Sequence, residues 1–170
     1  PDFAKVIPHV PYVKTPTSES LLWSVDKISM RRRFKAFDAK ITPKYKVARD
    51  ATKKTCEAIE KAVGFPLVIK PSGLAQSLLV TICYHQEELE RELKKIFRKI
   101  KKLQKQYKED ETEARILVEE FIDGSMYSID GYVNSRGKMY FCPLVDISTG
   151  KSIGFDDFFG YKQITPTSLG

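Results

Sequence analysis

The chain has 170 residues, enough for one or two domains with a real hydrophobic core. Its 42% hydrophobic and 30% charged residues are typical of a globular protein, and no apolar run approaches the roughly 20 residues of a membrane span. The net charge of +7 fits a phosphate-bearing partner but does not separate a nucleotide from a nucleic acid. Three cysteines at unrelated spacings (Cys56, Cys83 and Cys142) predict free thiols in an intracellular, cytoplasmic protein rather than disulfides or a metal site.

Residues 1–22 contain four prolines and show no helical or alternating period, which predicts a connecting segment. A helix is expected to begin near Lys27, with Ser24 or Asp26 as its N-cap. Its apolar residues at helical spacing are expected in the core, namely Met30, Phe34 and Phe37. The basic run 31–33 is interpreted as a solvated helix face, with an anion site as the alternative.

A short strand at 45–48 and a helix from Thr52 to Val63 follow, with Thr52 or Asp50 as cap and Gly64 as terminator. The apolar run 67–69 then predicts a strand buried on both faces, and Lys70 and Pro71 close it. A lysine at the mouth of a buried strand needs an anionic partner. We expect that partner to be a ligand and no protein group; the alternative is a lysine that extends into solvent.

The turn-rich loop 72–77 and a strand at 78–83 make a hairpin with the preceding strand. Backbone amides between Ser72 and Ser77 could cradle phosphate oxygens, although Gly73 is the only glycine among them. We expect residues 71–77 to be a mobile lid that orders on phosphate.

The longest predicted helix covers 86–107, where apolar residues recur at steps of three and four. Glutamates fill its beginning and lysines the rest, an order that helix stability favours and that also leaves nucleic-acid binding as an alternative. Strands are then predicted at 115–122, 126–134 and 138–147, with a hairpin turn at 134–137 and a possible last strand at 161–164.

The order of these motifs resembles the ATP-grasp superfamily, in its carbamoyl-phosphate-synthase-type and carboxylate–amine ligase branches. The resemblance covers nearly the whole chain and rests on four stretches: 26–27, 65–71, 86–89 and Val118-Glu119-Glu120-Phe121-Ile122-Asp123-Gly124. It implies an α+β ATP-grasp fold in which ATP lies between two subdomains, one of them a strand–loop–strand–helix lid. The implied divisions are a lead-in segment at 1–23, the start of the core at 24–64, the lid with phosphate loop and hinge strand at 65–122, and a truncated C-terminal subdomain at 123–170.

The resemblance also implies roles for single residues. Lys27 and Lys70 would contact the phosphates of ATP, together with the loop that holds Ser72 and Ser77. Glu119 would accept a hydrogen bond from the adenine amino group. The carbonyl of Glu120 and the amide of Ile122, here called the hinge, would bond the adenine edge. Phe121, together with Leu67 or Ile69, would lie against the ring. Adjacent strand residues point to opposite faces, so only one of the two glutamate side chains can face the nucleotide, and we favour Glu119.

Three features depart from the family pattern. Met126 stands where an acidic residue commonly holds the ribose, the phosphate loop is poor in glycine, and no acidic segment with Glu-x-Asn follows Asp157. We therefore expect the front portion of an ATP-grasp ligase, with no catalytic residue and no metal ligand of its own. Such an enzyme activates a small carboxylate as an acyl-phosphate for attack by an amine or similar nucleophile, with Mg²⁺ supplied in the complete enzyme by a further domain or subunit. The alternatives are a degenerate or regulatory nucleotide-binding module and a basic nucleic-acid-binding domain acting through the helix 86–107.

Overall fold

The computed structural model describes residues 15–72, 79–107, 114–149, 161–164 and 167. The chain divides into two compact units, Pro1–Ile122 and Asp123–Gly170. Of the residues predicted to form the lid, 71–77, only Pro71 and Ser72 are among those that the structure describes.

The helices of the first unit begin at identifiable caps. Asp26 accepts the amide of Ile28 and caps α3 (Lys27–Phe37), and Thr52 accepts the amide of Thr55 and caps α4 (Lys53–Val63), as expected. The long helix α5 (Gln86–Tyr107) has the predicted bounds. A helix in the connecting segment was not expected: α2 (Ser18–Val25) forms because Thr17 accepts the amide of Ser20. A short 3₁₀ turn, η2 (Ala39–Ile41), follows α3.

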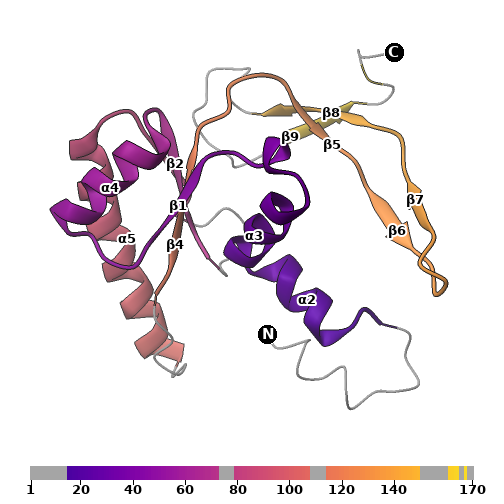
Figure 1. Ribbon diagram of the computed structural model, residues 1–170, viewed down its shortest axis with the longest axis horizontal. Helices are drawn as coiled ribbons and strands as arrows, with labels where there is room; N and C mark the ends of the chain where they lie inside the picture. The colour runs from indigo at the N-terminus through magenta and orange to yellow at the C-terminus, as the bar shows by residue number, and fades with distance from the viewer. Residues whose placement is uncertain (1–14, 73–78, 108–113, 150–160, 165–166, 168–170) are drawn as a thin grey trace. The chain divides into compact units, whose positions relative to one another are not determined.

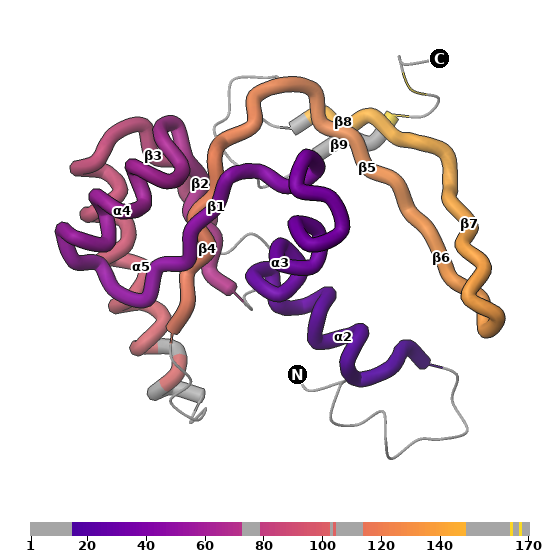
Figure 2. The backbone as a smooth tube through the Cα atoms, viewed as in Figure 1, coloured from indigo at the N-terminus to yellow at the C-terminus, as the bar shows by residue number. Residues whose placement is uncertain are grey.

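One antiparallel sheet organises this unit, and its strand order is β1-β4-β2-β3. The strands are β1 (Tyr45–Ala48), β2 (Leu67–Pro71), β3 (Thr81–Cys83) and β4 (Ile116–Glu120). Of the four strands in this sheet, β4 comes last along the chain, and it lies between β1 and β2. Helices α4 and α5 cover one face of the sheet, and α3 lies on the other side of it (Figures 1 and 2).

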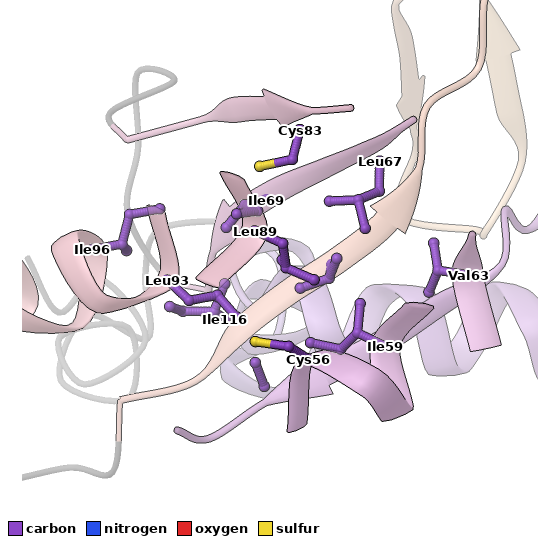
Figure 3. Close-up of a cluster of buried hydrophobic side chains, with 12 residues drawn as sticks. Cys56, Ile59, Val63, Leu67, Ile69, Cys83, Leu89, Leu93, Ile96 and Ile116 are labelled. Carbon is purple, nitrogen blue, oxygen red and sulfur yellow. The ribbon is translucent and has the colours of Figure 1, made fainter. Parts of the chain in front are cut away.

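The hydrophobic core fills the space between the sheet and the helices α4 and α5 (Figure 3). Alternate residues of the strands enter it, such as Leu67 and Ile69 of β2 and Ile116 and Val118 of β4, because successive strand side chains point to opposite faces. The helices contribute the residues predicted from their periodicity, namely Cys56, Ile59, Val63, Leu89, Leu93 and Ile96. The intervening strand residues, Val68, Lys70, Leu117 and Glu119, therefore face the side where α3 lies.

The prediction that Phe34 and Phe37 of α3 lie in the core is wrong. Phe34 is 41% exposed and Phe37 is 88% exposed, whereas Ile28 is fully buried. At 100° per residue, Phe37 lies half a turn around the helix from Ile28, so the two cannot face the sheet together. The buried face of α3 carries Ile28 and, three residues later, Arg31.

The second unit consists of short antiparallel strands: β5 (Met126–Ser128), β6 (Gly131–Val133), β7 (Met139–Phe141), β8 (Val145–Thr149) and β9 (Tyr161–Ile164). They form a three-stranded sheet, β5-β8-β9, and a two-stranded one, β6-β7. The predicted turn is present, and the side chain of Asn134 accepts the amides of Arg136 and Lys138 there. The two long strands expected at 126–134 and 138–147 are each interrupted, since β5 and β6 pair with different partners.

The described cysteines are free thiols, as predicted: Cys56 and Cys83 are buried and Cys142 is exposed. Burial raises the pKa of the Cys83 thiol to about 12. Within the described part of the chain, no helix has the length and apolar character needed to cross a membrane.

Two isoleucines of the first unit give a matched test of the core. Ile59 is fully buried in the cluster, and Ile41 is 56% exposed. Ile59→Ala should lower the free energy of unfolding by about 2–5 kcal/mol, because it removes buried methyl groups and leaves a cavity. Ile41→Ala should change it by no more than about 0.5 kcal/mol. Urea unfolding of the three proteins measures both values, and equal losses would contradict the assignment of the core.

Candidate functional site

The candidate site lies on the face of the sheet opposite the hydrophobic core. In the register of β2 with β4, Val68 is paired with Glu119 and Lys70 with Leu117. Paired residues of neighbouring strands share a face, so Lys70 and Glu119 emerge on the same side, toward α3. Lys70 lies two positions along the antiparallel ladder from Glu119, within reach of its long side chain, so the N-terminal turns of α3, β2 and β4 contribute side chains to one place.

A buried carboxylate with two cations occupies its centre. Arg31 donates from Nε to Oε1 of Glu119 and lies 3.4 Å from Oε2 through Nη2, while Lys70 donates from Nζ to Oε2 at 2.6 Å. The side chain of Glu119 is only 2% exposed, against 19% for Arg31 and 30% for Lys70. These three residues are called the Glu119 cluster. Burial pushes the pKa of Glu119 up, but the hydrogen bonds and charges of Arg31 and Lys70 outweigh it and leave that pKa lowered.

Two expectations are corrected by this cluster. Lys70 does have a protein partner, because the second carboxylate oxygen of Glu119 lies within hydrogen-bonding distance. Arg31 does not belong to a solvated helix face; it pairs with Glu119 because it lies on the side of α3 that faces the sheet. The cluster holds two positive charges and one negative charge, so it retains an excess positive charge.

A second set of polar contacts, here called the Asp26 cluster, fixes α3 to the sheet. The carboxylate of Asp26 accepts the amide of Ile28 and the hydroxyls of Ser29 and Ser72, and Arg115 lies 3.5 Å from it. Burial alone would raise the pKa of Asp26, but these donors outweigh it and lower that pKa. The N-cap of α3 is thereby attached to the residue at which the predicted phosphate loop begins.

The backbone at the end of β4 forms the third part of the site. The amide of Glu120 donates to the carbonyl of Lys44 at 3.0 Å, and the amide of Phe121 donates to the carbonyl of Pro66 at 3.0 Å. Ile122, just beyond the strand, is 70% exposed. The side chain of Glu120 points away from the Glu119 cluster and contacts Lys44 instead.

The predicted site residues are partly brought together. Lys70, Ser72 and Glu119 lie in the two connected clusters, and Lys27 is the first residue of α3, next to Asp26. Residues 120–122 follow Glu119 directly, and Ser77 is outside the described residues. The expectation that Leu67 or Ile69 lines the site is wrong, because both are buried in the core on the opposite face of the sheet. Sequence reasoning missed Arg31, Asp26 and Arg115 as site residues. Arg31 follows Lys27 by four residues, a spacing that places two helix residues on one face, and that signal could have separated it from its two basic neighbours.

These groups suit an anionic ligand better than a metal ion. Among the residues that the structure describes, no group of three or more histidine, cysteine or acidic side chains could hold a metal. The cations, in contrast, come from two elements and reach one place, where charge-assisted hydrogen bonds to an anion are strong.

The lowered pKa of Glu119 predicts a pH-dependent contribution to stability. Because the folded-state pKa lies below the ordinary value of 4.5, the contribution is present above pH 4.5 and is lost as the pH falls through the folded value. Glu119→Gln should therefore cost about 1–3 kcal/mol at pH 7, since two partly buried cations lose their charge partner. Chemical unfolding at several pH values should show this difference shrinking in acid. Glu57→Gln on the exposed side of α4 is the control and should cost little at any pH.

Comparisons with known proteins agree with this geometry. The sequence model of the ATP-grasp domain matches residues 63–168. A D-alanyl-alanine synthetase from Vibrio cholerae superposes over 87% of this chain with a TM-score of 0.63 at 14% identity, and an L-amino acid ligase from Bacillus licheniformis over 84% with 0.60 at 18%. A phosphoribosylamine–glycine ligase from Thermotoga maritima superposes over 76% with a TM-score of 0.57 at 25% identity. No curated protein matches the sequence.

The chain spans less than half of these structures, 42%, 31% and 30% of their respective lengths. The two structures below 25% identity establish the fold, and the family match covers more than half of the chain. The α+β architecture, the strand–loop–strand–helix order and the order of the motifs all agree with that match. This chain belongs to the ATP-grasp domain family.

Proposed function

We propose that the chain is the ATP-binding portion of an ATP-grasp ligase. The observation that carries the proposal is the Glu119 cluster, which brings Lys70 to the end of the central strand in a chain of this family. A site that gathers an excess of positive charge is suited to a polyphosphate. The proposal assigns the phosphates to the cations and the adenine to the hinge.

At the phosphate end, Lys70 is the residue able to exchange partners. It is the more exposed cation of the Glu119 cluster, and it reaches the carboxylate through a long flexible chain. When Lys70 turns to a phosphate, Glu119 keeps Arg31 as its counter-ion, so no unpaired buried charge remains. Lys27, at the first turn of α3, and Ser72 and Ser77 of the loop are proposed to supply the other phosphate contacts.

At the base end, the hinge offers an acceptor at the Glu120 carbonyl and a donor at the Ile122 amide. Adenine presents an amino group beside an unprotonated ring nitrogen, which matches that pair. Phe121 is proposed to lie against the ring. Glu119 remains a proposed acceptor for the adenine amino group through Oε1, which accepts from Arg31 Nε and has a second lone pair, whereas Oε2 accepts from both Lys70 and Arg31.

The complete enzyme is proposed to transfer the γ-phosphoryl group of ATP to a carboxylate oxygen, releasing ADP. An amine or similar nucleophile then attacks the acyl carbon, and phosphate leaves. Positioned cations and Mg²⁺ stabilise such a transfer, and the described residues offer no carboxylate set for the metal. We therefore assign binding, and no catalytic role, to these residues. A cytoplasmic location is part of the same proposal.

Two other functions make different predictions. A degenerate or regulatory module would bind nucleotide without supporting any ligase activity. A nucleic-acid-binding domain would use the exposed lysines of α5, of which Lys94 and Lys95 already pair with Glu90 and Glu92. Affinity for RNA that falls steeply with salt, and falls further in Lys101→Met, would favour the nucleic-acid function.

Lys70→Met tests the phosphate end. The methionine keeps the apolar stem and removes the charge, and Glu119 retains Arg31, so the fold should persist. Losing one charge-assisted contact should weaken ATP binding by about 10- to 100-fold, or roughly 1.5–3 kcal/mol. Calorimetry measures the affinity, and circular dichroism checks the fold. Lys101→Met on α5 is the control and should bind ATP as the parent does; unchanged affinity in Lys70→Met would refute the phosphate role.

The preference for ATP over GTP tests the base end. Guanine has a carbonyl where adenine has its amino group, so it would meet the Glu120 carbonyl acceptor to acceptor, at a cost of about 1–3 kcal/mol for each unpaired group. ATP should bind at least about tenfold more tightly than GTP. In Glu119→Gln the ratio should narrow, because the amide can donate to the guanine carbonyl. The ratio of the ATP and GTP affinities is compared because Glu119→Gln also removes the charge partner of Lys70, which should affect both nucleotides alike. Equal affinities in the parent would remove the hinge assignment.

A further inference from the structure

The last residue of β4 has an irregular pairing with the chain beside it. In antiparallel strands, hydrogen-bonded pairs alternate with pairs that make no backbone bond, and each bonded pair exchanges two N–H···O=C bonds. The amide of Glu120 donates to the carbonyl of Lys44 at 3.0 Å, so Lys44 and Glu120 form a pair of the bonded kind. A regular ladder would return the second bond, from the Lys44 amide to the Glu120 carbonyl.

That second bond is replaced by a bond to the side chain. The Lys44 amide donates to Oε1 of Glu120 at 2.9 Å, and the Lys44 ammonium lies 3.8 Å from Oε2. The carboxylate of Glu120 thus takes the donor that its own carbonyl would otherwise receive. A bond between the Lys44 amide and that carbonyl does not occur in the described part of the chain.

The strand on the other side of β4 supplies no replacement donor. The amide of Phe121 donates to the carbonyl of Pro66, and the amide of Ser72 donates to the carbonyl of Arg115, so odd-numbered residues of β4 bond to β2. Glu120, paired with Leu67, is therefore in a pair without backbone bonds on that side. The Glu120 carbonyl therefore points toward Lys44, but the Lys44 amide donates to the Glu120 carboxylate instead.

We propose that the Glu120 side chain is a positioning group that keeps the Glu120 carbonyl open for the amino group of an adenine nucleotide. The inference rests on the proposed function and adds a specificity-determining residue to it. Without the carboxylate, the Lys44 amide would turn to the carbonyl, complete the ladder and occupy the acceptor that reads the base. Glu120 then acts without touching the nucleotide through its side chain.

A purely electrostatic role for the pair is distinguishable from this one. The Lys44 and Glu120 side chains are 68% and 33% exposed, so their ion pair by itself contributes little to stability. The proposed role depends on the acceptor oxygen rather than on the charge. Glu120→Gln keeps an acceptor at the same reach, whereas Glu120→Met has a similar length and no comparable acceptor.

A structural measurement tests the first half of the proposal independently of any ligand. Through-hydrogen-bond NMR coupling between the Lys44 amide nitrogen and the Glu120 carbonyl carbon should be absent in the parent and in Glu120→Gln. It should appear in Glu120→Met, where the ladder closes. Such a coupling in the parent would overturn the inference and leave the proposed ATP binding in place.

Titration with ATP and with inorganic tripolyphosphate tests the second half, since tripolyphosphate reports the phosphate contacts alone. Glu120→Met should bind ATP about tenfold more weakly than the parent does, which corresponds to the loss of one hydrogen bond. It should bind tripolyphosphate with the same affinity as the parent. Glu120→Gln should bind both like the parent. Equal ATP affinity in all three proteins, equal losses for both ligands, or a Glu120→Gln that behaves like Glu120→Met would each overturn the inference. A parent that binds neither ligand would instead refute the proposed function, and the positioning role with it.

Discussion

The first unit depends on how one buried carboxylate is neutralised. Glu119 lies in the central strand with its side chain 2% exposed, a position where an unpaired charge would be very costly. Arg31 from α3 and Lys70 from β2 remove that cost, and in doing so they fix where α3 lies on the sheet. The apolar contacts of α3 alone are few, since Ile28 is its only described residue that is fully buried. The electrostatic pairing is therefore also a structural one, and it joins three elements that are distant in sequence.

The pairing of Glu119 with Arg31 and Lys70 also gives Lys70 a counter-ion when no anionic ligand is bound. A lysine that waited for phosphate in a half-buried place would be desolvated with no partner. In the Glu119 cluster, Lys70 has a partner until a phosphate arrives, and Arg31 allows Glu119 to release it. This arrangement weakens phosphate binding, because the phosphate must compete with the Glu119 carboxylate for Lys70. The Asp26 cluster limits the motion that this exchange requires, since it holds Ser72 and the start of α3 together.

Local signals in the sequence were sufficient where a structure is set by neighbouring residues. The helix 86–107 and the Thr52 cap follow from periodicity and from one side chain beside its own helix. Tertiary contacts decided the rest. Phe37 has the spacing of a core residue, but the face of α3 that meets the sheet is chosen by Arg31 and its pairing with Glu119. The two motifs that contain Lys70 and Glu119 were recognisable, whereas the bond between these residues depends on the register of β2 with β4, which the sequence does not state.

That register also explains why the end of β4 is suited to reading a base. Odd-numbered residues of the strand bond to β2, and the even-numbered residues Ile116 and Val118 pair with β1, so the ladder is regular up to Glu119. At the end of the strand both neighbours stop donating, for different reasons. Pro66 has no amide hydrogen to return, and the Lys44 amide is held by the Glu120 carboxylate. The backbone pairing of β4 with both of its neighbours therefore stops at Glu120 and Phe121, next to the Glu119 cluster. A strand that ended by fraying would leave the same groups exposed to water without a fixed direction, whereas here the carbonyl direction is set by the bonds on both sides of it.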